Sequence, residues 1–315
     1  PFEGTELEAM QKYDYIDFVI RLYEREYTIG LLLLELEKNP KKKAFTDIKG
    51  LMFRLDGKII DTGKRKPFDD LSHLISTAPL LKTINLSKYR ELYIEAGRGC
   101  PFSCTFCFYS ATRPRKRKID DIISELKVVQ RKVPHIWLHD LNMLVDEKWT
   151  NELCDKIIEN NIKADWGTDA RLDECSNLEL LKKMRKAGCY LLAFGLESAD
   201  QDILEKINKR INMESLGIAI KNCRLAGIHP EVNIMYGFPW ETESSLKKAE
   251  KILREVPVST LSIVRPLRGT ALYADFKKMG LLEKELGIDD YVFMRNNPIS
   301  DLPNISKENI LKWHR

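Results

Sequence analysis

Three closely spaced cysteines are the residues of this sequence most capable of chemistry. Cys100, Cys104 and Cys107 follow the spacing C-x3-C-x2-C, and no fourth cysteine stands nearby. A structural zinc site needs four protein ligands, and an electron-transfer 4Fe-4S cluster also needs four thiolates. The spacing therefore predicts a 4Fe-4S cluster in which one iron stays open for a substrate or cofactor. A partial zinc site, or three unrelated thiols, is the alternative interpretation.

Composition limits what the rest of the chain does. The 315 residues carry a net charge of +4 with acidic and basic residues intermixed, so charge gives no case for nucleic-acid binding. No signal peptide opens the chain and no apolar run reaches membrane-spanning length, so we expect a cytoplasmic, oxygen-sensitive protein without membrane contact. The remaining cysteines are predicted to be small buried apolar residues; they are Cys154, Cys175, Cys189 and Cys223.

The elements that must position the cysteines alternate between strands and helices from residue 91 onward. Strands are expected at 92–96, 135–138, 164–168, 190–196, 232–237 and 259–264, and helices at 119–133, 146–159, 178–187, 213–226 and 243–256. This alternation predicts parallel strands joined by right-handed crossovers. Six units cannot close an eight-stranded barrel. We therefore expect an α/β fold with a partial (β/α)6 TIM-like barrel.

The first ninety residues do not show this regular alternation of strands and helices. A strand is expected at 13–21, a helix at 24–37 and a hairpin at 51–61 that turns at Asp56-Gly57. These elements predict a small N-terminal α+β segment over residues 1–90, followed by the barrel over 91–275 and a C-terminal extension over 276–315.

Polar residues stand where the expected strands end, which is where the loops of a parallel barrel converge. Asp140 follows the second strand, Arg171 the third and Glu197 the fourth. A carboxylate directly after an apolar strand is costly to bury without a partner, and a guanidinium suits a bidentate carboxylate. The alternatives are that Asp140 caps its own loop and that Arg171 forms a surface salt bridge.

Several of these motifs resemble those of the radical S-adenosylmethionine (SAM) enzymes. The cysteine spacing, Phe106 before the third cysteine and the sequence Gly195-Leu-Glu197-Ser198 carry the resemblance. It implies that the amino and carboxylate groups of SAM chelate the open iron. An electron from the reduced cluster then cleaves SAM to methionine and a 5′-deoxyadenosyl radical. It also implies an electron donor such as flavodoxin or ferredoxin.

The same resemblance implies roles for individual residues. Phe106 would lie against the adenine, Asp140 would receive the SAM ammonium, and Glu197 would contact the ribose or methionine moiety. Arg171 is placed to pair with the SAM carboxylate. Met235 and Gly237 belong to a segment similar to the family's Gly-x-Pro-Gly-Glu-Thr turn, where Gly237 allows the backbone to approach the adenine.

One further motif points to a subgroup of that family. Pro67-Phe-Asp-Asp-Leu71 resembles the linker of radical SAM proteins that carry an N-terminal cobalamin-binding domain, which implies a methyltransferase or cyclase. Residues 13–37 would be the last strand and helix of that domain, most of which is missing here. We therefore expect that this chain by itself does not bind cobalamin tightly. The alternatives are a cobalamin-free radical SAM enzyme and a non-catalytic iron–sulfur or zinc module. The substrate is not read from the sequence.

Overall fold

The computed structural model describes residues 4–21, 23–41, 44–293 and 297–314. The chain divides into two compact units. One comprises residues 1–69 and 265–295, and the other comprises residues 70–264 and 296–315. The functional boundaries after residues 90 and 275 are not tested by this division and stay predictions.

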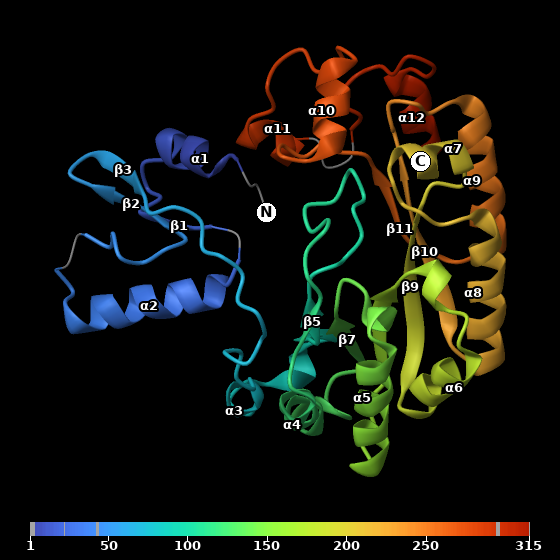
Figure 1. Cartoon of the computed structure of the whole chain (residues 1–315), viewed down its shortest axis with the longest axis horizontal. Helices are drawn as coiled ribbons and strands as arrows, with labels where there is room; N and C mark the ends of the chain where they lie inside the picture. Colours follow the sequence, from blue (N-terminus) through green and yellow to red (C-terminus); the bar gives the residue numbers. More distant parts are fainter. Residues whose placement is uncertain (1–3, 22, 42–43, 294–296, 315) are drawn as a thin grey trace. The chain divides into compact units, whose positions relative to one another are not determined.

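The larger unit is built on a six-stranded parallel sheet in the order β11-β10-β9-β8-β7-β4 (Figure 1). Its strands are β4 (Glu91–Glu95), β7 (His135–His139), β8 (Trp166–Ala170), β9 (Cys189–Glu197), β10 (His229–Tyr236) and β11 (Val258–Ile263). Each new strand adds beside its predecessor, and in the described residues β4 and β11 remain edges, so the barrel is partial. The predicted partial (β/α)6 barrel is confirmed.

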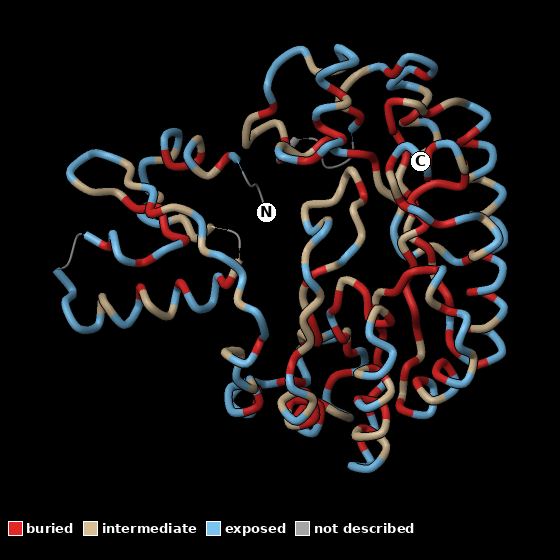
Figure 2. The backbone as a smooth tube through the Cα atoms, viewed as in Figure 1, coloured by how far each residue is buried: buried red, intermediate tan, exposed pale blue. Residues whose placement is uncertain are grey.

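One face of this sheet is covered by the crossover helices. These are α4 (Ile119–Val129), α5 (Glu147–Glu159), α6 (Leu178–Lys186), α8 (Met213–Ala226) and α9 (Glu243–Glu255). Figure 1 shows α8 and α9 running along the outside of the strands, and the central strands β8 and β9 are largely buried (Figure 2). Strand β10 alternates strictly between buried positions and exposed or half-buried ones, because successive side chains point to opposite faces.

Local signals set the helix ends where the sequence predicts them. The Asp146 carboxylate caps α5 by accepting a hydrogen bond of 2.9 Å from the Trp149 backbone N–H. Gly227 ends α8 with a φ of +76°, a conformation that glycine adopts without steric cost. The largest differences from the predicted boundaries are in three elements. Strand β8 is shifted by two residues from the predicted 164–168, β10 begins at His229 rather than 232, and α4 ends at Val129 rather than 133.

Short elements of the larger unit carry too little periodicity to be predicted. They are α3 (Ala78–Leu81), the two-stranded ribbon of β5 (Gly97–Arg98) and β6 (Arg115–Lys116), α7 (Gln201–Lys206) and α12 (Lys307–His314). The ribbon matters most, because it closes the base of the cysteine loop. Among the described residues, no helix has both the length and the apolar character that crossing a bilayer requires.

The smaller unit contains an antiparallel sheet in the order β1-β2-β3, formed by β1 (Phe18–Ile20), β2 (Leu51–Leu55) and β3 (Lys58–Asp61). Its helices are α1 (Glu6–Lys12), α2 (Arg25–Lys38), α10 (Ala271–Lys278) and α11 (Ile288–Phe293). The predicted hairpin and helix α2 are confirmed. The strand expected over 13–21 is only three residues long, because the Arg54 guanidinium binds the Met10, Tyr13 and Ile16 carbonyls and holds the preceding segment in turns. Leu32, Phe45 and Phe53 belong to the core of this unit.

Candidate active site at the carboxyl end of the sheet

The three cysteines lie on a closed loop between β5 and β6. The Cys100 backbone N–H donates to the Thr112 hydroxyl over 3.0 Å, and the Thr112 N–H donates to the Cys100 carbonyl over 2.9 Å. Gly99 has a φ of +91°, and a Cβ there would overlap the Arg113 carbonyl. Backbone and side-chain hydrogen bonds thus shape the loop before any ligand binds.

The three cysteines lie on the same loop and form no disulfide. Cys104 is buried, whereas Cys100 and Cys107 are half-buried. Burial raises the pKa of the Cys104 and Cys107 thiols. Cys100 adds to the rise at Cys104, and Cys104 and Cys100 add to it at Cys107. Lys209 counteracts this effect at both thiols. Three free thiols on one loop with a cation beside them fit a metal centre held by three thiolates.

A second loop, residues 207–210, holds the cysteine loop in place. The Ile207 carbonyl accepts a hydrogen bond of 2.9 Å from the Thr105 N–H. The Asn208 amide donates to the backbone carbonyl and hydroxyl of Ser103 over 2.9 and 2.8 Å. Asn208 itself has a φ of +54°. Loop 207–210, which the sequence analysis did not single out, therefore positions the residues between the first and third cysteines.

Glu197 ends β9 in an ion pair with Lys209. The carboxylate and ammonium are 3.0 Å apart, and the two side chains are 11% and 9% exposed. Glu197 has a φ of +68°, which is unfavourable for a residue with a side chain. A Cβ at Gly195 would lie 2.7 Å from the Lys209 ammonium and would overlap the Glu197 carboxylate, so a larger residue there would displace the charged ends of the pair. The sequence predicts Glu197 but misses Lys209.

Arg171 connects the end of β8 to both loops. Its guanidinium binds the Asp173 carboxylate through two hydrogen bonds of 3.0 Å and donates to the Lys209 carbonyl over 2.9 Å. Its Cζ also lies 3.6 Å from the centre of the Phe102 ring, in the cysteine loop. Arg171 is buried, so the alternative of a surface salt bridge does not describe it. Its N–H groups donate to Asp173 and to the Lys209 carbonyl and so help to hold loop 207–210.

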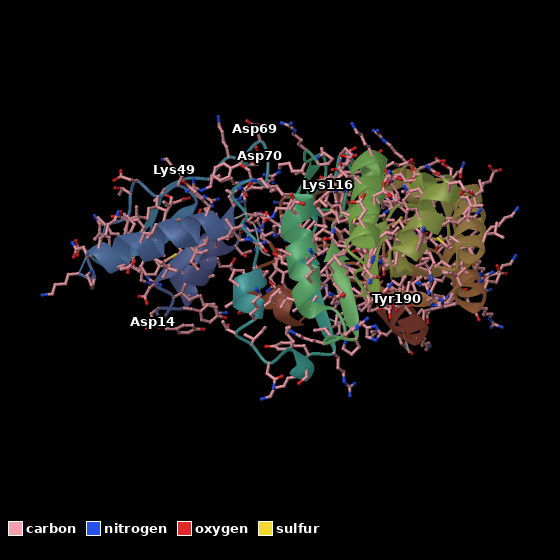
Figure 3. The ribbon with its side chains drawn as sticks, turned by 90° about the horizontal axis from the view of Figure 1, so that it is seen from below. Asp14, Lys49, Asp69, Asp70, Lys116 and Tyr190 are labelled. Atoms are coloured by element: carbon pink, nitrogen blue, oxygen red, sulfur yellow. The ribbon has the colours of Figure 1, made fainter. Side chains whose placement is uncertain are left out.

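Asp140 follows β7 and is buried against Lys116. The ion pair measures 2.6 Å, and Lys116, labelled in Figure 3, also donates to the Asn142 and Met143 carbonyls over 3.2 Å. The second Asp140 oxygen accepts the Asn142 N–H over 3.0 Å, so Asp140 also caps its loop. Burial raises the pKa of Asp140, and Lys116 counteracts that effect. The sequence gives no signal for this pairing.

The ends of β10 and the cysteine loop bring two aromatic rings together. The Phe106 ring lies 6.4 Å from that of Phe238 in an edge-to-face arrangement. Gly237 has a φ of +96°, and its N–H donates to Glu241 over 3.2 Å. Burial raises the pKa of Glu241 to about 7, with a Ser245 hydrogen bond opposing that effect. Met235 is half-buried near this turn.

Asp169 in β8 is a further residue that the sequence analysis missed. Burial raises the pKa of its carboxyl group, and the nearby acids Asp140 and Glu197 add to the effect. The Trp137 indole N–H donates to Asp169 over 3.1 Å, and His139 opposes the rise in pKa. The carboxylates from the ends of three adjacent strands therefore share one region, as a parallel sheet predicts.

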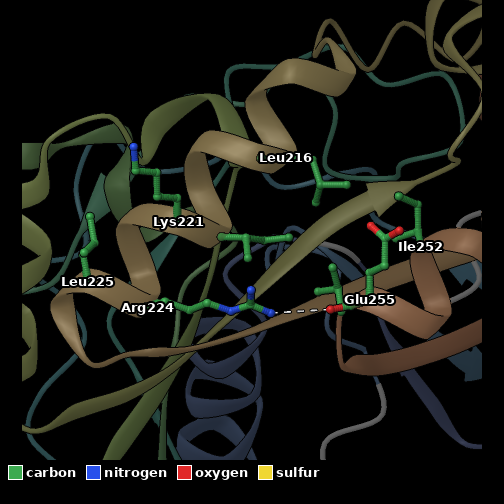
Figure 4. Close-up of a pocket in the computed structure, with 9 residues that line it drawn as sticks. Leu216, Lys221, Arg224, Leu225, Ile252 and Glu255 are labelled. Carbon is green, nitrogen blue, oxygen red and sulfur yellow. Dashed lines mark hydrogen bonds between the residues drawn. The ribbon is translucent and has the colours of Figure 1, made fainter.

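A groove on the opposite, helical face lies between α8 and α9 (Figure 4). It measures about 540 Å³ and is lined by apolar residues such as Leu216 and Ile252 together with Lys221 and Arg224. The Arg224 guanidinium donates to the Glu255 carbonyl over 3.4 Å. None of the predicted site residues lines this groove, so it does not belong to the site described above.

Known proteins resemble the chain in both sequence and fold. It is 26% identical to an uncharacterized methyltransferase of Pyrococcus horikoshii over 321 aligned residues, covering 98% of this chain and 67% of that protein. It is 30% identical to the anaerobic magnesium-protoporphyrin IX monomethyl ester cyclase of Rubrivivax gelatinosus over 211 residues, covering 64% of this chain and 38% of the cyclase. The chain thus spans only part of these relatives.

Solved structures share the fold at lower identity. The methyltransferase TsrM of Kitasatospora setae, solved with cobalamin and a [4Fe-4S] cluster, superposes with a TM-score of 0.67 at 16% identity. The match covers 90% of this chain and 59% of TsrM. The cobalamin-dependent enzyme OxsB superposes with a TM-score of 0.65 at 18% identity, over 80% of this chain and 38% of OxsB.

A family model decides the assignment. The model of the Radical SAM superfamily matches residues 94–253, which are 160 of the 315 residues and contain the cysteine loop and five of the strand ends of the sheet. Enzymes of this superfamily use a 4Fe-4S cluster and SAM and need a reductant. The chain belongs to the radical SAM superfamily, and its partial barrel is the fold of that family.

Proposed function

We propose that this chain is the catalytic part of a cobalamin-dependent radical SAM methyltransferase or cyclase that acts on an unactivated C–H bond. The observation that carries the proposal is the position of three free thiols on one loop, with the Glu197–Lys209 pair close enough to act on the Cys104 thiol. The names of the relatives, which include both a methyltransferase and a cyclase, support the reaction class.

Cys100, Cys104 and Cys107 would hold the cluster. When bound and reduced, it supplies the electron that cleaves SAM to methionine and a 5′-deoxyadenosyl radical. The protein keeps the cysteines together through the hydrogen bonds that Thr112, Ile207 and Asn208 make within and beside the loop. Lys209 contributes a positive charge that favours thiolates over thiols.

Glu197 is the first proposed contact with SAM. Its carboxylate is buried at the strand end, and Lys209 is its single ion-pair partner in the described part of the chain. A carboxylate held this way accepts hydrogen bonds from the ribose hydroxyls or the methionine ammonium of SAM. The positive φ of Glu197 also supports a binding role, because residues with strained backbone conformations are concentrated at binding sites.

The remaining proposed contacts follow the turns and loops around Glu197. Phe106 and the Gly237 backbone would lie against the adenine, with Met235 beside them. Arg171 would pair with the SAM carboxylate, and Asp140 would receive the ammonium. Asp140 already binds Lys116, so a SAM ammonium must share that carboxylate with the lysine.

The reductant of the cluster is proposed to be a flavodoxin or a ferredoxin, in keeping with a reaction in the cytoplasm. Either donor must approach the cysteine loop, where Tyr109 is an exposed aromatic residue.

Anaerobic reconstitution tests the cluster assignment. A triple variant with Cys100, Cys104 and Cys107 changed to alanine should bind no 4Fe-4S cluster and should form no 5′-deoxyadenosine from SAM under dithionite. The matched control changes Cys154, Cys175 and Cys223 to alanine and should retain both properties, because these buried thiols lie outside the cysteine loop. Four irons and SAM cleavage in the first variant would contradict the proposal.

The SAM products distinguish the reaction classes. Methyl transfer from SAM releases S-adenosylhomocysteine, whereas a radical reaction without methyl transfer yields methionine and 5′-deoxyadenosine but no S-adenosylhomocysteine. Equilibrium dialysis with hydroxocobalamin tests the separate expectation that this chain alone does not retain the corrinoid. Retention at micromolar affinity or tighter, equivalent to about −8 kcal/mol, would overturn that expectation.

A further inference from the structure

The face of the large sheet opposite the helices carries a row of aromatic side chains. Tyr93 in β4 pairs in register with Trp137 in β7, and Glu95 pairs with His139. The residues between them, Ile94 and Leu138, are buried. Since side chains alternate along a strand, Tyr93, Trp137 and His139 all face the open side of the sheet. We call these three residues the aromatic row.

Trp137 is fixed within this row by two constraints. A Cβ at Gly167 in the neighbouring strand would lie 2.7 Å from Cζ3 of the indole, so the ring lies across a glycine that leaves room for it. The indole N–H donates to the Asp169 carboxylate over 3.1 Å. Gly167 and Asp169 of the adjacent strand β8 therefore hold the indole ring against the sheet.

The other aromatic side chains are exposed. Tyr93 is 62% exposed, and its ring lies 6.4 Å from that of His139 at an angle of 64°. The row continues on the same sheet with His135 and Tyr190, whose rings are 5.6 Å apart and the second of which is labelled in Figure 3. Exposed aromatic groups that gather on one surface usually mark a binding site.

The dimensions of the row indicate the kind of ligand. Adjacent strands are about 4.8 Å apart, so the surface from Tyr93 on β4 to the Trp137 indole, which lies over Gly167 of β8, extends roughly 10 Å across the sheet. Aromatic rings, unlike aliphatic side chains, favour a ligand that also has a π system. The row is also continuous with the candidate active site, because Asp169, which holds Trp137, lies near Asp140 and Glu197.

We propose that the aromatic row is the substrate platform of this enzyme and binds a flat, conjugated ring system about 10 Å wide by stacking against Tyr93 and Trp137. This inference rests on the proposed function for the identity of the ligand as substrate. His139, beside Tyr93, is the polar residue that contacts the edge of the ring system. Trp137 and Gly167 set specificity together, because one supplies the surface and the other leaves space for it.

Binding of flat probes to the chain without cluster or SAM tests the platform. Protoporphyrin IX and 1-pyrenebutyrate are conjugated carboxylic acids of two sizes, and cholate is a carboxylic acid without a conjugated ring. Fluorescence titration should show saturable binding of at least one flat probe, and cholate should not displace it. The absence of saturable binding by both flat probes, or equal competition by cholate, would overturn the proposal.

Two variants locate the binding. Trp137→Leu removes the stacking surface, and Gly167→Ala retains the indole but displaces it. Each should weaken binding of the flat probe at least fivefold while the far-ultraviolet circular dichroism stays unchanged. Trp313→Leu, in α12, is the matched control and should bind normally. If both platform variants bind as the unaltered chain does, the probe binds elsewhere and the proposal is wrong.

The test also separates this inference from the proposed function. The triple cysteine variant should lose SAM cleavage yet bind the flat probe as the unaltered chain does. Probe binding in a chain that fails to cleave SAM after reconstitution would contradict the proposed function but leave the platform intact. The reverse result would contradict the platform alone.

Discussion

Two buried acid–lysine pairs stand at strand ends of the same sheet and differ in how completely they are satisfied. Lys116 binds Asp140 and two backbone carbonyls. Lys209 binds Glu197 and, within the described residues, makes no other side-chain hydrogen bond. A buried pair with more partners is held more firmly by the fold, whereas a pair with unused hydrogen-bonding capacity beside the cysteine loop exchanges partners with a ligand more readily.

The backbone reinforces this contrast. Glu197 has a φ of +68°, whereas Asp140, which is also a described residue, does not have a positive φ. Lys209 also acts on Cys104 and Cys107, whereas Lys116 acts on Asp140 and Glu174. Proximity to the end of a barrel strand therefore does not by itself identify a ligand contact. The number of hydrogen bonds that each lysine already makes distinguishes a structural role of its acid partner from a ligand-binding role.

The largest expected effect comes from breaking the satisfied pair. Lys116→Met leaves the Asp140 carboxylate buried without its cation and should lower the free energy of unfolding by about 3–5 kcal/mol. Urea denaturation of the cluster-free chain measures it. Lys209→Met is the matched comparison and should cost less than half as much. Equal losses would show that the two pairs serve the fold alike.

A third buried acid, Glu241, accepts hydrogen bonds but pairs with no lysine among the described residues, and it should make stability depend on pH. Its pKa is raised by burial from 4.5 to about 7, so the folded state retains a proton that the unfolded state has lost. The resulting stabilisation is fully present below pH 4.5 and is lost as pH rises through about 7, a change of about 3 kcal/mol.

Denaturation of the unaltered chain and of Glu241→Gln at pH 5 and pH 8 measures this dependence. Glutamine cannot ionise, so the variant should lose the component of the pH dependence that Glu241 contributes. The hydrogen bond from the Gly237 N–H to residue 241 can form with either side chain. An identical difference between pH 5 and pH 8 in both proteins would contradict the assignment.

Glu197→Gln should weaken SAM binding by roughly 1–3 kcal/mol, the range for losing a hydrogen bond to a charged group. Calorimetric titration of the reconstituted protein measures the change, and a circular dichroism spectrum checks folding. Asp140→Asn is the comparison: if its partners make it structural, it should alter stability more than SAM affinity. Unchanged SAM affinity in a folded Glu197→Gln protein would remove Glu197 from the site.

Arg171→Ala should produce a similar or smaller loss of SAM affinity, again roughly 1–3 kcal/mol. It should also speed amide hydrogen exchange in residues 102–107, because the guanidinium contacts Phe102 and the Lys209 carbonyl. Faster exchange with unchanged SAM affinity would assign Arg171 to loop positioning alone. Lys206→Ala, which removes a cation above the Trp240 ring, serves as a control for loss of charge.

Much of this molecule was readable from local sequence. The spacing of Cys100, Cys104 and Cys107 predicts a three-thiol loop, and alternating strand and helix patterns predict the partial barrel. Asp146 and Gly227 mark helix ends through interactions within a few residues. These predictions were correct because each depends on backbone conformation or periodicity within one short segment of the sequence.

Only the tertiary structure paired the charges and placed the rings. Lys116 meets Asp140 across 24 residues, and Trp137 meets Asp169 across 32. These contacts depend on which strands are neighbours and on their register, and no local pattern encodes either. Lys209 was missed for the same reason, since it becomes a neighbour of Cys104 only when loop 207–210 folds against the cysteine loop. The sequence determined which reactive and charged side chains the chain carries, and long-range packing decided which of them lie together in one site.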